Sequence, residues 1–175
     1  LFAGYKSQDL KRTFNHRVRN EFSRKPPISG AIIAQDSIAH LPKPVQKYLA
    51  FVGAIGKERV YNVKIVAEGE MKLTPQGSWS PADVVQYNFW GHIPTRFFYI
   101  TVSKFGFPIL GLHTYDSNNS RINIKLAGLF TIADATGREM RETDTVTLFN
   151  DMCLFAPASL IDERIHWDAL DDLTV

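Results

Sequence analysis

Histidines, serines and carboxylates are the side chains of this chain that could carry acid–base, nucleophilic or metal chemistry. A metal site needs ligands at matched spacing, such as His-x-x-x-His on a helix, and no histidine pair has that spacing. No Gly-x-Ser-x-Gly elbow and no glycine-rich phosphate loop occurs either. The histidines are scattered singly, at His16, His40, His92, His113 and His166. The sequence therefore predicts no metal, no cofactor and no catalytic residue.

One group of chemically capable residues falls between positions 113 and 120. Ser117 or Ser120, together with His113 and Asp116, would make a hydrolytic triad if the three side chains met. Successive residues of a strand point to opposite faces of a sheet, so we do not expect them to meet. His113 and Tyr115 share a strand face among apolar neighbours, and a hydrogen-bonded core histidine is favoured there over a ligand contact.

Aromatic residues are the more informative group, because they crowd adjoining predicted strands. Dense aromatics on neighbouring strands usually pack a core, but they would also line an apolar cavity between a curved sheet and its helices. If such a cavity exists, we predict that its ligand-binding residues are Trp79, Tyr87, Phe89, Phe98, Tyr99, His113 and Tyr115.

A long hairpin positions the first of these aromatics. Residues 59–73 alternate between apolar and polar side chains, which is the period of a β-strand with one buried face. Residues 74–77 supply Pro and Gly for a reversal, and a second strand starts at Ser78. The residues expected to face one interior are Tyr61, Val63, Ile65, Met71, Ile122, Ile124 and Leu126.

The rest of the chain adds strands and covering helices. Apolar spacing of three and four residues predicts helices, and period two predicts strands. Helices are expected over residues 7–22, 41–52 and 143–154, and further strands over 96–105, 107–116, 121–126 and 164–175. The second helix should lie across the sheet, and the third should bury a stripe of Val146, Phe149 and Cys153. These elements predict an α+β fold with a curved, half-barrel-like antiparallel sheet covered by a few helices.

The N-terminal segment differs from the rest in charge. Residues 1–25 hold seven basic and two acidic side chains, whereas the whole chain of 175 residues carries only +2. We divide the chain into residues 1–30, a basic amphipathic helix with a Pro-rich linker, and residues 31–175, a single α+β domain. The helix stripe either packs on the domain or lies on an anionic membrane, and nucleic acid is disfavoured because no base-stacking motif is present. The predicted membrane-contact residues are Lys11, Arg12, Arg17 and Arg19.

Several stretches together resemble an uncharacterised bacterial domain family of unknown function. They are the LPKPVQKYL run from Leu41, the Gly77-Ser78-Trp79 turn, Gln86-Tyr87 and residues 115–137. This resemblance implies a membrane helix ahead of the domain and a fold similar to periplasmic lipoprotein carriers. It implies no catalytic residues. We also expect the chain to be an excerpt, truncated at its C-terminus and preceded by further sequence that includes its Met.

These observations favour a non-enzymatic, membrane-associated domain of the bacterial envelope that binds an apolar or amphipathic ligand such as a lipid. An enzyme acting on a lipid-like substrate and a structural, partner-binding domain remain the alternatives. A cavity lined only by apolar side chains would favour binding, whereas a carboxylate beside His113 or His92 would favour catalysis. The sequence does not indicate an oligomeric state.

Overall fold

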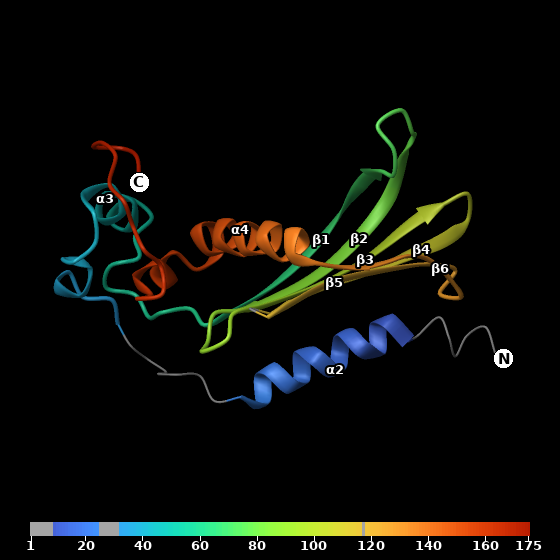
Figure 1. Cartoon of the computed structure of the whole chain (residues 1–175), viewed down its shortest axis with the longest axis horizontal. Helices are drawn as coiled ribbons and strands as arrows, with labels where there is room; N and C mark the ends of the chain where they lie inside the picture. The colour runs from blue at the N-terminus through green and yellow to red at the C-terminus, as the bar shows by residue number, and fades with distance from the viewer. Residues whose placement is uncertain (1–8, 25–31, 117) are drawn as a thin grey trace.

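The computed structural model describes residues 9–24, 32–116 and 118–175 of the chain. One antiparallel sheet contains β1 (Asn62–Lys72), β2 (Trp79–Phe89), β3 (Thr95–Lys104), β4 (Phe107–Asp116), β5 (Asn119–Leu126) and β6 (Phe130–Thr136), in that order. The helices are α2 (Asp9–Ser23), α3 (Lys43–Phe51) and α4 (Arg138–Phe155), with short 3-10 turns η1 (Asp36–Ile38) and η2 (Pro157–Ile161). The sheet is curved and not closed (Figure 1), so the predicted α+β class is confirmed.

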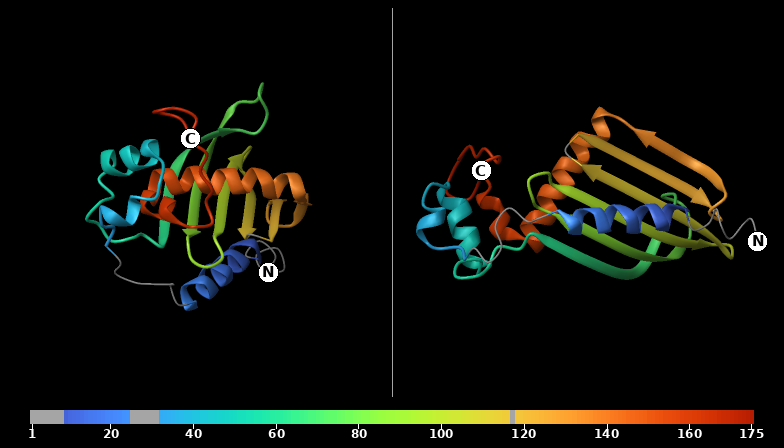
Figure 2. Two further views of the ribbon diagram at one scale, coloured as in Figure 1. Left: turned by 60° about the vertical axis from the view of Figure 1, so that its left-hand side comes forward. Right: turned by 90° about the horizontal axis from the view of Figure 1, so that it is seen from below.

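Hairpin connections decide what lies at each end of this sheet. Because every strand pairs with the next one along the chain, the turns alternate between the two ends. The β1–β2, β3–β4 and β5–β6 turns lie together at one end, here called the tip end (Figures 1 and 2). The β2–β3 and β4–β5 connections lie at the other end, where β6 leads into α4.

Helix α2 packs lengthwise on one face of the sheet (Figure 1). Its residues Leu10, Phe14 and Val18 follow one another every four positions and are all buried. The centre of the Phe14 ring lies 6.0 Å from the centre of the Tyr87 ring and 5.7 Å from that of the Tyr99 ring. The predicted helix is therefore present, and its apolar stripe packs on the sheet. Of the predicted linker, residues 25–30 lie outside the described residues.

Helix α4 crosses the opposite face of the sheet, near the end of the sheet that lies away from the tip end (Figure 2). It is longer than predicted. Of the predicted stripe, Phe149 and Cys153 are half-buried against the core, but the placement of Val146 is wrong because this residue is 60% exposed. The side chains that α4 buries are instead Asp144, Leu148 and Met152. Two of these belong to an apolar stripe, but the third is a carboxylate. A search for apolar periodicity alone cannot find such a face.

A second core lies beyond the end of the sheet. Helix α3 forms as predicted, with Pro44 in its first turn and Gly53 at a φ of 68° just after its end. Its buried residues Val45 and Leu49 pack in a cluster with Trp90, the two 3-10 turns and the end of α4. The prediction that this helix lies across the sheet is wrong. The predicted strand over residues 164–175 is also wrong, because that segment has no strand structure.

Strand register confirms which residues share a face. Val63, Ile65 and Met71 of β1 point to the same side as Ile122 and Ile124 of β5. This is the side that α4 crosses, here called the α4 face. This face is only partly covered, however, since Met71 is 40% exposed. The reason is that α4 covers only part of this face.

Candidate functional site

Side chains on the α4 face form rows across the strands, because neighbouring strands pair residue against residue. The row farthest from the tip end contains Val63, Asn88, Arg96, Tyr115 and Ser120. The next row contains Ile65, Gln86, Phe98, His113, Ile122 and Ala135. These two rows hold most of the polar groups of the face, and α4 lies over them.

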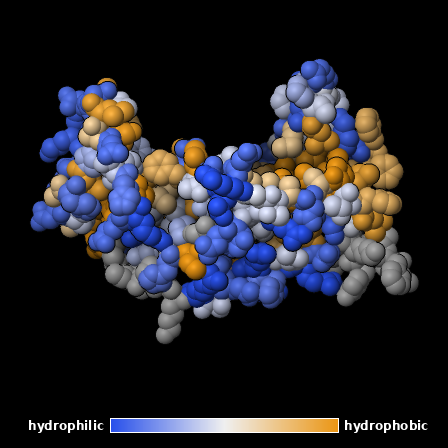
Figure 3. Space-filling view, viewed as in Figure 1, coloured by the Kyte–Doolittle hydropathy of each residue, from blue (hydrophilic) through white to orange (hydrophobic). Residues whose placement is uncertain are grey.

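The two following rows are apolar. The first contains Ala67, Val84, Ile100, Gly111, Ile124 and Ala133, and the second contains Gly69, Ala82, Val102, Ile109, Leu126 and Phe130. Figure 3 shows hydrophobic side chains gathered here, beside the raised β1–β2 hairpin. Polar residues therefore lie under the helix, whereas the apolar rows lie beside it: Ala82 and Val102 are buried, and Ile100, Ile109 and Ile124 are half-buried. Apolar surface that a fold leaves partly uncovered is typical of binding sites.

The uncovered part of the α4 face is hollowed. A depression of about 200 Å³ lies over β3, β4 and β5, with Met71 and Leu73 at one side. Gly111 lies in its floor, and a Cβ there would come within 2.8 Å of Ile100 Cγ2. The remaining lining residues are Phe98, Val102, Ile109, Leu112, His113, Ile122 and Ile124. We call this depression the apolar hollow.

His113 is the polar exception at one end of the hollow. Its Nε2 atom lies 2.8 Å from Asp144 Oδ2 of α4 and 3.5 Å from Ser120 Oγ. Ser120 donates its own hydroxyl hydrogen bond to the same Asp144 oxygen. In a hydrolytic triad the histidine bridges the serine and the acid with different ring nitrogens. Here both partners meet one nitrogen, so the arrangement does not activate Ser120 as a nucleophile.

A second polar cluster fixes α4 two helical turns further on. Asp151 Oδ2 accepts hydrogen bonds from Gln86 Nε2 at 2.7 Å, Asn88 Nδ2 at 2.9 Å and Arg96 Nε at 3.3 Å. Arg96 Nη2 also donates to the side-chain amide oxygen Oε1 of Gln86, at 3.0 Å. Buried polar groups stabilise a fold only when they are paired, and here each partner is satisfied within the network. The helix is therefore held in one position, which leaves the hollow beside it open.

The structure divides the predicted ligand-binding residues among several places. Only Phe98 and His113 line the apolar hollow. Tyr115 lies under α4, where its hydroxyl is 2.9 Å from Thr145 Oγ1. The other four lie on the α2 side of the sheet: Trp79, exposed near the tip end, and Tyr87, Phe89 and Tyr99, which pack beneath α2. Most residues that line the hollow were not predicted as ligand-binding residues. The sequence pattern that could have indicated them is the set of small and aliphatic residues that pair with one another on neighbouring strands.

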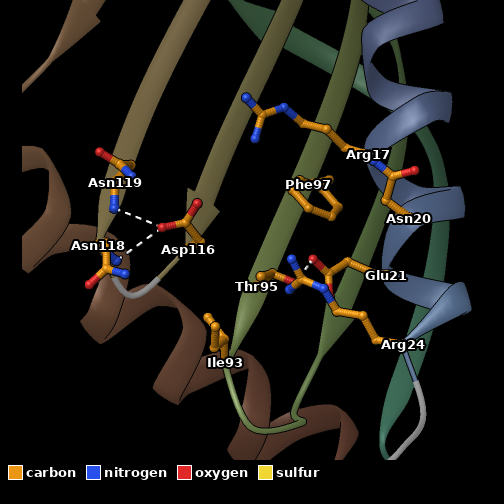
Figure 4. Close-up of a pocket in the computed structure, with 10 residues that line it drawn as sticks. All are labelled: Arg17, Asn20, Glu21, Arg24, Ile93, Thr95, Phe97, Asp116, Asn118 and Asn119. Carbon is orange, nitrogen blue, oxygen red and sulfur yellow. Dashed lines mark hydrogen bonds and ion pairs between the residues drawn. The ribbon is translucent and has the colours of Figure 1, made fainter.

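The predicted membrane-contact residues Lys11, Arg12, Arg17 and Arg19 are all exposed on α2. Arg17 also lines a polar cleft of about 300 Å³ between α2 and the sheet (Figure 4). Glu21 pairs with Arg24 in this cleft at 2.8 Å, and burial raises the pKa of the Glu21 carboxyl although Arg24 opposes that effect. Asp116 faces the cleft from the β4 end. Two acids therefore balance two arginines, and the cleft has no charge preference for an anion.

Two further results limit the chemistry of the described residues. They contain no group of three or more His, Cys, Asp or Glu side chains placed to hold a metal ion. Among these same residues, no helix has the length and apolar character needed to cross a bilayer.

Comparison with known proteins gives a family. The model of a family of unknown function, DUF6544, matches residues 31–175. The chain belongs to this family. The resemblance seen in the sequence is thereby confirmed as membership, while the membrane anchor and the carrier-like fold that it implied stay predictions. Neither curated proteins nor solved structures gave a match.

Proposed function

We propose that this member of the DUF6544 family binds the apolar part of an amphipathic ligand, such as an acyl chain of a lipid, in the apolar hollow. The observation that carries the proposal is the placement of side chains on the α4 face. Ile100 and Ile124 are only half-buried and line the apolar hollow, while the polar residues Asn88 and Asp144 are buried under α4. A fold that needed only a core would place its helix over the apolar rows.

The size and chemistry of the hollow support an acyl chain over a larger ligand. Pockets for drug-sized molecules enclose roughly 300–1,000 Å³ and place several polar groups around the ligand. The hollow measures about 200 Å³ and has a polar group only at His113, where it approaches α4. Such a site favours a flexible apolar chain whose polar end remains in water or near this histidine.

The proposal includes action at a membrane of the bacterial envelope. Ligands with long apolar chains are found in membranes, and the excess of basic residues in 1–25 suits an anionic lipid surface. Because Leu10, Phe14 and Val18 pack on the sheet, α2 would contribute its charged face and the exposed ring of Phe22 to such contact.

Filling the hollow tests the proposal. Ile124→Trp places an indole in the hollow, and Val66→Trp is the matched control, since Val66 is 62% exposed on the other face of β1. We expect a fluorescent apolar probe to bind the wild type and the control and to lose most of its affinity for Ile124→Trp. Native mass spectrometry of the purified wild type should show a bound lipid. Equal probe binding by all three proteins would contradict the proposal.

A second candidate function, catalysis on a lipid-like substrate, is favoured by the His113–Asp144 pair at the end of the hollow. A buried acid beside a histidine is an arrangement that can move a proton. Incubating the protein with esters of acyl chains separates the two functions. Turnover that disappears in His113→Gln would favour catalysis, whereas unchanged esters with retained probe binding would favour binding alone.

A further inference from the structure

The tip end of the sheet consists of three turns (Figures 1 and 2), and each of them has large apolar side chains on it or beside it. Trp79 flanks the β1–β2 turn and is 61% exposed, Phe105 on the β3–β4 turn is 87% exposed, and Phe130 beside the β5–β6 turn is 66% exposed. Phe107 and Leu129 are exposed next to them. Single exposed apolar residues are ordinary, but three adjacent turns with the same character form a surface.

Charge at the tip end has one sign. The segments 72–79, 104–107 and 126–132 contain Lys72 and Lys104 and no acidic residue. Each lysine lies over an exposed aromatic ring: the Lys72 ammonium is 5.1 Å from the centre of the Trp79 ring, and the Lys104 ammonium is 5.1 Å from that of Phe105. Aromatic rings beside lysines suit the boundary of a lipid bilayer, where rings enter the interface and ammonium groups meet anionic headgroups.

Phe105 occupies its position against local preference. It has a φ of 52°, and the next residue, Gly106, has a φ of 79°. These left-handed values belong to a two-residue hairpin turn in which Asn-Gly is the preferred pair. A bulky residue in this conformation is unfavourable, and exposing a phenyl ring adds to the cost. A residue kept under local strain points to a role outside the fold.

We propose that the three turns of the tip end form a docking surface for an anionic lipid bilayer. Trp79, Phe105 and Phe130 enter the interfacial layer while Lys72 and Lys104 contact the headgroups. The hollow extends to Leu73, which lines it and follows β1 into the first turn. The proposed docking depends only on the residues of the three turns. Passage of an acyl chain from the bilayer to the hollow depends in addition on the proposed function.

Co-sedimentation with vesicles tests the docking surface. Phe105→Asn installs the preferred turn residue, so the thermal midpoint should stay at or above the wild-type value. Binding to vesicles of phosphatidylglycerol and phosphatidylcholine at low salt should weaken at least tenfold, because a buried phenyl ring is lost. Lys72→Gln and Lys104→Gln should each weaken it about fivefold. Vesicles of phosphatidylcholine alone should bind weakly.

A matched control lies at the opposite end of the molecule, in and beside α3. Phe51 is 89% exposed there, so Phe51→Asn removes an equally open ring. Lys43→Gln and Lys57→Gln remove exposed charges that match Lys72, whereas Lys104 is half-buried and donates to Ser78 Oγ at 2.8 Å. These variants should bind vesicles as the wild type does. Wild-type binding by Phe105→Asn, or an equal loss in the control, would overturn the proposal. So would a wild type that ignores vesicles and instead forms dimers that Phe105→Asn abolishes.

The soluble apolar probe separates this inference from the proposed function. Phe105→Asn should bind the probe normally without vesicles, because the hollow is unchanged. Ile124→Trp should still bind vesicles, because its turns are unchanged. If vesicle binding depends on the tip end while Ile124→Trp also retains the probe, the docking surface stands and the proposed function fails.

Discussion

Replacing Asp151 tests whether paired polar groups, and not apolar packing alone, hold α4 on the sheet. Its carboxylate accepts hydrogen bonds from Gln86, Asn88 and Arg96. The side chains of Arg96 and Asp151 are only 11% and 16% exposed, and Asn88 is fully buried. Asp151→Met therefore leaves a buried guanidinium and a buried amide without their acceptor. Breaking a buried ion pair from one side costs about 3–5 kcal/mol.

Urea unfolding of a double-mutant cycle measures this cost. Arg96→Met should also destabilise strongly, but the double variant should lose on the order of 1–3 kcal/mol less than the sum of the two single changes, because neither charge is then unpaired. The control is the Arg121–Asp134 pair, whose side chains are 56% and 36% exposed, and where the same changes should move the urea midpoint little. An Asp151→Met cost below about 1 kcal/mol, or strictly additive single changes, would refute the reasoning.

Three more outcomes are expected. A hydrogen bond from Arg164 lowers the pKa of Asp162 from 3.8 to about 2; because the folded pKa is the lower one, this pair stabilises the fold above about pH 4 and its contribution is lost as the pH falls toward 2. The urea midpoint of the wild type should therefore fall more between pH 4 and pH 2 than that of Asp162→Asn. Gly111→Ala should cost about 1–3 kcal/mol by pressing on Ile100, whereas Gly69→Ala, with no atom within 4 Å of its Cβ, should not destabilise. Burial raises the pKa of the Cys153 thiol, so a thiol reagent should label it slowly in the native protein and quickly in urea; fast native labelling would show an accessible thiolate.

Strands β1 to β5 and two of the helices could be predicted because their signals are local, whereas β6 was not predicted. The alternation through Val63 and Ile65 has the period of a strand wherever the sheet lies, and the spacing of Leu10, Phe14 and Val18 has that of a helix. Even the boundaries of the first hairpin follow from its turn residues. None of these patterns says which element covers which face, since that depends on contacts between distant segments.

The buried side of α4 shows where local patterns fail. Apolar periodicity selected Val146, yet the helix turns Asp144 and Leu148 to the sheet, because Ser120 and His113 supply partners for the carboxylate. Those partners lie on other elements and could not be matched to Asp144 in advance. The hollow was not predicted for the same reason. Gly111 makes room in its floor because it pairs with Ile100 of the neighbouring strand, and this pairing cannot be read from the sequence.

Methyl NMR spectroscopy tests the binding proposal most directly. The protein would be labelled at the isoleucine δ1 methyl groups and titrated with a short-chain phospholipid below its critical micelle concentration. We predict saturable shifts of Ile100, Ile122 and Ile124, which line the hollow, and no shift of Ile33 and Ile38, which lie in the other core. Shifts confined to other isoleucines, or no shift at any concentration, would contradict the account.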